Sequence, residues 1–198
     1  MNLLHAAILL QDQHSARHLA KELASSGRID INERDRRGNT AIHYATIQDY
    51  PDVVDMLVER GADVNIVNLT GVNALYLCAK NGSAATAILL LRGGASVDTV
   101  VHSERVLHVA AGKGNFGVVE VLLLAGAMVN PLRSGSSDPA DFLYDGATPI
   151  FLASLNGHAD VVEVLVESGA RVDQLTLRGE SPIFVASLNG HADVVRVL

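Results

Sequence analysis

The last 18 residues of the chain nearly repeat a stretch that begins 33 residues earlier. Residues 148–165 read TPIFLASLNGHADVVEVL and residues 181–198 read SPIFVASLNGHADVVRVL, with the same residue at 15 of the 18 positions. Internal repeats with a period of about 20–50 residues indicate small structural units that each pack against the next. This repetition constrains the fold more than any other feature of the chain.

Less exact copies precede these two. Thr40 begins TAIHYATIQDYPDVVDMLVERGADVN, Asn73 begins NALYLCAKNGSAATAILLLRGGASVD, and Arg105 begins RVLHVAAGKGNFGVVEVLLLAGAMVN. Near the start of the chain, LLHAAILL and RIDIN match the two ends of a further copy. Six copies in phase, the first atypical and the last partial, predict an array of repeats.

Each copy carries the residues that begin and end two short helices. Thr40, Thr148 and Ser181 stand where a hydroxyl can cap a helix N-terminus, and Pro149 and Pro182 follow at the first helical position. Glycines that adopt a left-handed conformation are expected to end the helices, at Gly82, Gly114, Gly157, Gly190, Gly61, Gly94, Gly126 and Gly169. Isolated helices shorter than about 12–15 residues are marginally stable, so each repeat must bury its apolar face against the next repeat.

These copies resemble the ankyrin repeat, whose pattern is G-x-T-P-L-H-x-A-A-x-x-G-H, then a V-V-x-x-L-L run and G-A-x-V-N. The resemblance implies an all-α fold, an α-solenoid of stacked ankyrin helix-turn-helix repeats with short β-hairpin fingers. We expect one ankyrin-repeat domain over residues 1–198, with repeats at about 1–34, 35–67, 68–99, 100–131, 143–175 and a partial one at 176–198. We also expect the chain to continue beyond residue 198, because the last copy lacks its final turn; the alternative is an uncapped end that frays or self-associates.

Two connections depart from the pattern. The finger over residues 131–143 is extended by about ten residues rich in Pro, Gly, Ser and Asp, which predicts a surface loop, with contact to a partner as the functional alternative at Phe142 and Tyr144. The copy that begins at Arg105 has Ser103 in place of the turn glycine and no capping threonine. We therefore expect a looser edge from His102 to Arg105.

Composition excludes several classes of protein. The formal net charge of −7 argues against a general nucleic-acid binder, since phosphate contact depends on Lys and Arg. The single cysteine favours a reducing compartment, and no apolar run approaches the roughly 18 residues needed to span a bilayer. We expect a cytoplasmic protein, with the nucleus as the alternative, that binds a protein partner, binds no nucleic acid, does not insert into membranes and is a monomer.

The sequence offers little catalytic chemistry. Gly112, Gly114 and Gly117 match G-x-G-x-x-G, but a dinucleotide site needs a strand before them, and a helix is expected there. The resemblance implies that the repeated histidines, His5, His43, His108, His158 and His191, hydrogen-bond within and between repeats. Cys78 occupies a small buried position, and the carboxylates Asp160, Glu163, Asp193 and Glu120 are expected on a solvated face. We expect no enzyme activity, cofactor or metal.

In the ankyrin family, partners usually bind the concave side formed by finger tips and first helices. Carried onto this chain, that surface comprises Arg36, Arg37, Asn39, Gln48, Leu69, Thr70, Lys80, Asn81, His102, Lys113, Tyr144, Asp145, Asn156, Arg178, Glu180 and Asn189, with Ile47, Val72, Glu104, Leu155, Leu177 and Leu188 beside them. Arginine and tyrosine are the favoured anchors at interfaces, which ranks Arg36, Arg37, Tyr144 and Arg178 highest. The first full finger is basic and the extended finger is acidic, so the expected partner segment has the opposite polarity.

Two other functions stay open at this stage. In the first alternative, the array is a regulatory or targeting module of a larger protein, whose enzymatic, channel or ubiquitin-ligase part lies beyond residue 198. In the second it is a substrate: Asn65 and Asn130 end G-A-x-V-N fingers, each with a leucine eight residues before, Leu57 or Leu122. That arrangement resembles the sites of asparaginyl hydroxylases that act on ankyrin repeats.

Overall fold

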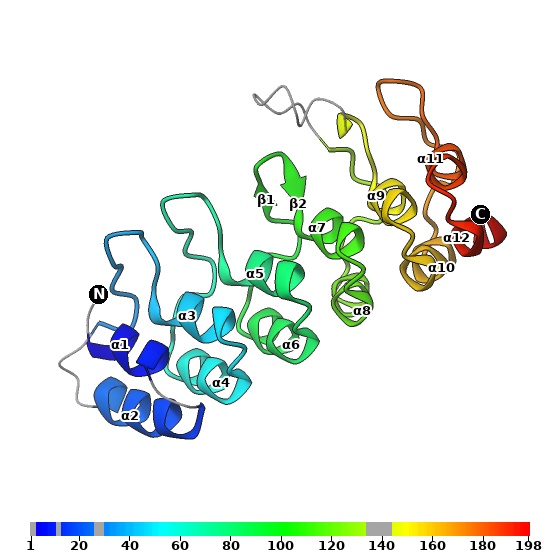
Figure 1. The fold of residues 1–198 in the computed structure, drawn as a ribbon. Helices are drawn as coiled ribbons and strands as arrows, with labels where there is room; N and C mark the ends of the chain where they lie inside the picture. The colour runs from blue at the N-terminus through cyan, green and yellow to red at the C-terminus, as the bar shows by residue number, and fades with distance from the viewer. Residues whose placement is uncertain (1–2, 11–12, 26–29, 134–143) are drawn as a thin grey trace. The chain divides into compact units, whose positions relative to one another are not determined.

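The computed structural model describes residues 3–10, 13–25, 30–133 and 144–198, and Figure 1 draws them as a ribbon. These residues form twelve helices and one two-stranded sheet. The helices are α1 (Leu3–Leu10), α2 (Gln13–Ser25), α3 (Ala41–Ile47), α4 (Pro51–Glu59), α5 (Ala74–Asn81), α6 (Ala84–Arg92), α7 (Val106–Gly112), α8 (Phe116–Leu124), α9 (Pro149–Asn156), α10 (Ala159–Glu167), α11 (Pro182–Leu188) and α12 (Ala192–Val197), and the strands are β1 (Val100–Val101) and β2 (Glu104–Arg105).

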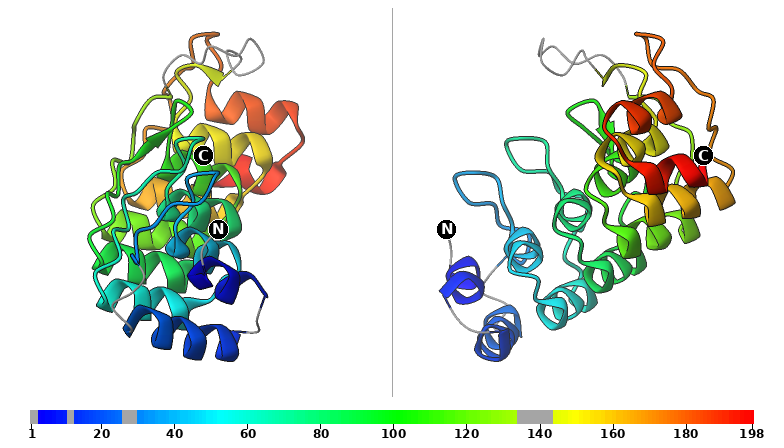
Figure 2. Two further views of the ribbon diagram at one scale, coloured as in Figure 1. Left: turned by 90° about the vertical axis from the view of Figure 1, so that its left-hand side faces the viewer. Right: turned by 45° about the vertical axis from the view of Figure 1, so that its right-hand side comes forward.

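The chain divides into two compact units, unit 1 over residues 1–96 and unit 2 over residues 97–198. In unit 1 the first helices α1, α3 and α5 pack side by side, and the second helices α2, α4 and α6 form a parallel row beneath them. The connections to the next copy project beyond the first helices, as Figures 1 and 2 show. We call these connections fingers.

Unit 2 repeats the same arrangement. Its first helices α7, α9 and α11 pack in sequence, and α8, α10 and α12 form the second row, on the side away from the fingers. Every copy is thus a helix pair that buries its apolar face against its neighbours, which confirms the predicted stack of helical repeats. None of the helices in the described residues has the length and apolar character that a membrane crossing requires.

Two of the three predicted hydroxyl caps accept a backbone N–H, whereas the Thr40 hydroxyl bonds to Nδ1 of His43. The Thr148 and Ser181 hydroxyls accept the N–H of Phe151 and Phe184, and both helices have proline at their first position. At the same position of α5, the Asn73 side chain accepts the N–H of Tyr76, which the sequence reasoning had not identified as a cap.

Glycine is required at the end of α9. Gly157 has a φ of 80°, and a Cβ built there would lie 2.6 Å from Nδ1 of His191 in the next copy. The seven other glycines predicted to end helices also have positive φ. The helix ends therefore follow the sequence, and at Gly157 the close contact between copies adds a second reason for glycine.

The core of unit 2 shows how one copy covers another. Ala147, Phe151 and Leu152 of one copy pack with Val185 of the next, and Tyr144 and Leu155 lie against them half-buried. In α12, Val194 is fully buried. The helix pair α9–α10 supplies the surface that buries it, since α10 contacts α12.

The expectation of a looser edge from His102 to Arg105 is wrong. Strands β1 and β2 pair there in antiparallel register, Val100 with Arg105 and Val101 with Glu104. His102 and Ser103 have φ of 49° and 70°, so two consecutive left-handed residues close the turn. Two-residue turns of this kind match the twist of paired strands, and this finger forms a hairpin without the glycine that the other fingers use.

The extended finger lies largely outside the described residues. Residues 134–143 include the predicted surface loop and Phe142, so neither prediction is tested. The prediction of a single domain over residues 1–198 likewise stays a prediction.

Candidate functional site

The finger tips of unit 1 form an exposed surface with both charge and apolar area. Arg36, Arg37, Leu69 and Thr70 are all exposed, and the Leu69 side chain retains 74% of its accessible surface. The N–H of Leu69 donates to the carbonyl of Arg37 at 2.9 Å, which joins the two tips. We call these four residues the unit 1 fingertip patch.

Polar side chains beneath the patch hold the two fingers together. The Asn68 side chain donates to Oδ1 of Asn39 at 2.9 Å and accepts the N–H groups of Thr70 and Val72. The Arg34 guanidinium donates to the carbonyls of Gly38 and Val67. Arg34 and Asn39 thus stabilise the fingers from below.

Asp35 closes the first of these fingers. Its carboxylate accepts the N–H groups of Arg37 and Asn39 and the hydroxyl of Tyr44. Desolvation acts to raise the pKa of Asp35, but these hydrogen bonds outweigh it and lower the pKa below its ordinary value. An ionised Asp35 therefore fixes the backbone that presents Arg36 and Arg37.

Unit 2 has a corresponding tip. Leu177 is 75% exposed, and its N–H donates to the carbonyl of Asp145 at 3.0 Å, as Leu69 does to Arg37. Arg178 follows it and is exposed. We call Leu177 and Arg178 the unit 2 fingertip patch. In unit 1 the leucine and the arginines thus lie on two tips that are bonded to each other, and in unit 2 the leucine and the arginine lie on one tip.

Three residues of the predicted contact surface are buried, and Val72 is one of them. Asn39 and Asp145 are almost without accessible surface, because each lies at the base of its tip where the next finger packs over it. They hold the tips in place and offer a partner little side-chain area. Both therefore leave the predicted contact surface.

Arg133 was missed by sequence reasoning. Its side chain is 6% exposed, its Nε lies 3.1 Å from Oε1 of Glu104, and its guanidinium lies over the Tyr144 ring at 5.9 Å from the centroid. The backbone of Arg133 also pairs with Ala147 and Gly146. An arginine beside a Pro- and Ser-rich loop gives no sequence indication that it will be buried, because its partner Glu104 lies in an earlier finger.

Arg133 changes the ranking of Tyr144. The Tyr144 ring is half-buried between the Arg133 guanidinium and the core around Phe151. The predicted anchor is therefore already engaged within unit 2.

The remaining predicted contact residues divide by what their side chains do. Lys80, Asn81, His102 and Lys113 are exposed, and Gln48 and Glu180 are half-buried. Asn156 and Asn189 are exposed, but each amide donates to a carbonyl of the preceding copy, Gly112 or Leu155. Partner binding by these residues stays a prediction.

The buried histidines connect neighbouring copies. In His108, Nδ1 accepts the N–H of Arg105, and Nε2–H donates to the carbonyls of Pro131 and Ala147 at 3.1 and 3.2 Å. His43 makes the equivalent bonds to Thr40 and Val72.

His158 and His191 bond the preceding copy through Nε2, at Gly112 and Leu155. These contacts confirm for His43, His108, His158 and His191 that the histidines hydrogen-bond within and between repeats.

Burial favours the neutral form of the His43 and His108 rings. Desolvation lowers the pKa of His43, and it lowers the pKa of His108 to about 4, although hydrogen bonds to carbonyls act in the opposite direction. Both rings bridge neighbouring copies.

Cys78 is fully buried, and burial raises the pKa of its thiol, which keeps it protonated. Gly112 is the last residue of α7, so a helix precedes the G-x-G-x-x-G match as expected, and no strand–turn–helix is formed. In the part of the chain that the structure describes, no group of three or more His, Cys, Asp or Glu side chains could hold a metal ion.

Asparagines at the ends of the copies form a second set of bridges. Asn65 accepts the N–H of Ser96 and donates to the carbonyl of Gly94, both at 2.9 Å. Asn130 does the same with Arg171 and Gly169. Both proposed hydroxylation sites therefore have their amide groups engaged, and their modification stays a prediction that a +16 Da mass shift would test.

Comparison with known proteins agrees with the repeat structure. A family model described as "Ankyrin repeats (3 copies)" matches residues 1–68, 60–133 and 107–198. The solved structure titled "Crystal Structure of EF0377 an Ankyrin Repeat Protein" superposes with a TM-score of 0.81, over 98% of this chain and 94% of that one. At 21% identity, that likeness shows the fold alone.

Curated relatives are larger proteins. E3 ubiquitin-protein ligase XBAT32 of Arabidopsis thaliana is 27% identical over 158 residues, which cover 70% of this chain and 31% of that protein. The B-cell lymphoma 3 protein homolog of Mus musculus is 36% identical over 106 residues, which cover 52% of this chain and 24% of that protein. The chain thus spans about a third or less of the length of these relatives.

Proposed function

The chain belongs to the ankyrin-repeat family, generally a protein-interaction module, and we propose that it is a non-enzymatic scaffold that binds a partner protein through its finger tips. The observation that carries this proposal is the exposed leucine beside arginine at the tips of both units. Leu69 and Leu177 retain about three quarters of their accessible surface in a fixed backbone position. A pre-organised apolar anchor beside a cation favours a partner segment that carries apolar and acidic residues.

The absence of catalytic function is part of the proposal. The titratable side chains most shielded from water, His108 and Cys78, are held in their neutral forms by burial. Asp35 and His43 bond to backbone groups of the fingers. Such groups support the repeats and are poorly placed to act on a substrate.

The test is a quantitative pull-down from native extract with three forms of the chain. The first is the wild type, the second carries Arg36→Glu, Arg37→Glu and Leu69→Ala, and the third carries Arg196→Ala as a matched control. Arg196 is exposed on α12 and pairs with Asp193 one turn away, so its removal costs little stability. All three should have equal melting temperatures before the comparison.

We expect proteins that the wild type and the Arg196 variant both enrich and the fingertip variant loses. Binding of such a partner should weaken as salt rises, because exposed arginines contribute to it. Equal enrichment by all three forms would refute the fingertip assignment. Enrichment that salt leaves unchanged would exclude the role of the arginines.

A second candidate function is a targeting module within a larger protein. The curated relatives favour it, since this chain matches 24–31% of the two described above, one of which is named a ubiquitin-protein ligase. In that case the finger tips recruit the protein on which another domain acts. Reading the coding sequence around these residues, and then assaying the encoded whole protein for the activity of any added domain, decides between the candidates.

A further inference from the structure

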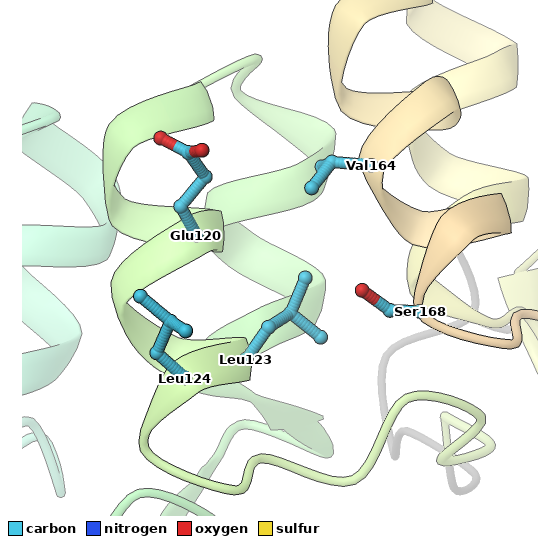
Figure 3. A pocket seen from close by; sticks show the side chains of 5 residues that line it. All are labelled: Glu120, Leu123, Leu124, Val164 and Ser168. Atoms are coloured by element: carbon cyan, nitrogen blue, oxygen red, sulfur yellow. The ribbon is translucent and has the colours of Figure 1, made fainter.

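The second helices of unit 2 leave a cavity of about 230 Å³ between α8 and α10. Glu120, Leu123 and Leu124 of α8 line it on one side, and Val164 and Ser168 lie on the other. Figure 3 shows Val164 and Ser168 directed toward α8 and Leu123 directed back toward them. This surface lies on the side of unit 2 away from the fingers, so it is separate from the fingertip patches (Figure 1).

The rim of this cavity is apolar and exposed. Leu124 retains 88% of its accessible surface, the largest fraction of any large apolar side chain in the described residues, and Met128 just beyond α8 retains 55%. Scattered single exposed leucines need no explanation, but apolar residues gathered beside a cavity mark interaction sites. We call this cavity, with Leu124 at its edge, the outer groove.

The other copies show that stacking does not require apolar residues here. Leu124 lies two residues before the glycine that ends the second helix. The three other complete copies have a charged residue at this position. At the position of Met128 they have a polar or charged residue. These residues are Glu59, Arg92 and Glu167 for Leu124, and Asp63, Ser96 and Arg171 for Met128. Both positions are thus apolar in a single copy, and Leu124 lines the cavity.

The two helices that form the outer groove carry carboxylates, of which Glu120 lines the cavity. Helix α8 carries Glu120, α10 carries Asp160, Glu163 and Glu167, and neither helix contains Lys or Arg. Asp160 lies one turn before Val164 and therefore on the same face of α10. The nearest following cation, Arg171, is in the segment after α10, where its backbone binds Asn130. A groove with an apolar floor and acidic edges favours a basic amphipathic occupant.

The size of the cavity favours a side chain over a small molecule. Small-molecule sites have volumes of about 300–1,000 Å³ and enclose most of their ligand, whereas this cavity is smaller and open beside Leu124. Amphipathic helices bind grooves of this kind by placing apolar residues at i, i+3 or i+4 into them. The second helices of unit 2 run alongside each other and leave such a groove between them.

We propose that the outer groove binds a basic amphipathic helix of a partner protein. An apolar side chain of that helix enters the cavity against Leu123, Leu124 and Val164, and its Lys or Arg residues meet Glu120, Asp160 and Glu167. This binding site is independent of the finger tips, so one chain can hold two partners at once.

The test uses the 198-residue chain and a fluorescein-labelled helical peptide of about 18 residues, or five turns, with leucine on one face and lysine on the other. A second peptide has glutamate in place of every lysine. Fluorescence anisotropy measures the binding of both peptides to the wild type, Leu124→Glu and Leu69→Glu. The last variant is the matched control, because it changes an exposed leucine at a finger tip. Circular dichroism confirms that all three chains are folded.

We expect the leucine–lysine peptide to bind the wild type and Leu69→Glu alike, and to bind Leu124→Glu about tenfold or more weakly, the effect of losing one buried leucine contact. Leu124→Glu adds a negative charge, so binding driven by net charge alone would become tighter. Tighter or equal binding to Leu124→Glu, equal binding of the leucine–glutamate peptide, or no binding to the wild type would each overturn the proposal. A dimer of the chain that Leu124→Glu dissociates would also overturn it, because the occupant would then be a second copy.

Discussion

Lowering the pH from 7 to 5 should destabilise unit 2 through His108. The ring is fully buried, accepts the N–H of Arg105 through Nδ1 and donates through Nε2–H to two carbonyls of the following segment. A proton added at Nδ1 would meet the N–H of Arg105 in place of a lone pair. Protonation therefore removes one hydrogen bond and leaves a charge in the core.

The magnitude follows from the pKa. Burial lowers the pKa of His108 from 6.5 to about 4, so the unfolded chain binds the proton more readily than the folded chain between those values. The stability that depends on the neutral ring is fully present above pH 6.5 and is lost as the pH falls toward 4. Full loss corresponds to about 3 kcal/mol, and the change from pH 7 to pH 5 to about 2 kcal/mol.

The assay compares the wild type with His108→Gln by urea unfolding at pH 7, 6 and 5. Glutamine can accept and donate hydrogen bonds but does not titrate, so the variant should be less stable than the wild type at pH 7. Its free energy of unfolding should fall about 2 kcal/mol less between pH 7 and pH 5. The exposed His102, changed to Gln, controls for the loss of a histidine as such.

The other buried histidines do not disturb the comparison. The pKa of His43 is also lowered by burial, but His43 is present in both proteins and its effect cancels in the difference. A direct check is the titration of the His108 Cε1–H resonance by NMR. An equal loss of stability in the two proteins, or an NMR midpoint near 6.5, would refute the reasoning.

Three further predictions concern stability, each measured by thermal or urea unfolding. Gly157→Ala should lower the free energy of unfolding by about 2–3 kcal/mol, because the new Cβ has a left-handed backbone and meets the His191 ring of the next copy. Gly169→Ala has the same backbone strain but open space around it, and should cost about 1 kcal/mol. Equal costs would exclude the contact between copies. Arg133→Met should lower the free energy of unfolding by about 3 kcal/mol, because it removes the ion pair of Glu104. Adding Glu104→Gln to the same chain should recover part of that loss. No recovery would refute the pairing. Asp98→Asn should stabilise unit 2 by about 1 kcal/mol, because it supplies the amide donor that asparagine has at this position in other copies. The ion pair of Asp98 with Arg105, at 4.0 Å, contributes little to stability. A loss of stability would show that this ion pair matters more than the amide donor.

Local structure was largely predictable from the sequence. Thr148, Pro149 and Gly157 fix the start and the end of α9 by requirements that operate within a few residues, and the structure has all three as expected. The repeat itself then predicted the stacking, because a helix pair that recurs with the same apolar residues must find the same surface on its neighbour. Recognition of the family and fold therefore needed no long-range information.

What the sequence did not reveal depends on contacts between distant segments. Arg133 is buried because Glu104 lies beneath it, and no spacing rule connects an arginine in one finger with a glutamate in another. Asn39 is buried because Asn68 of the next finger bonds to it, although the pattern placed it on a tip. The ordered turn at His102 and Ser103 was not predicted because residues other than glycine rarely adopt a positive φ. Both residues do so here, and the missing turn glycine therefore did not prevent the hairpin.

Near-identical copies also indicate where to look for function. A residue that the complete copies share is required by stacking, as the buried Leu57, Leu90, Leu122 and Leu165 illustrate, and its retention says nothing of partners. A residue that differs among copies and is exposed is free of that requirement. Leu124 meets both conditions, since its equivalents are charged and its own side chain is almost fully exposed. An apolar residue kept at such a position costs solubility without contributing to the core, and a binding partner is the physical reason that would offset the cost.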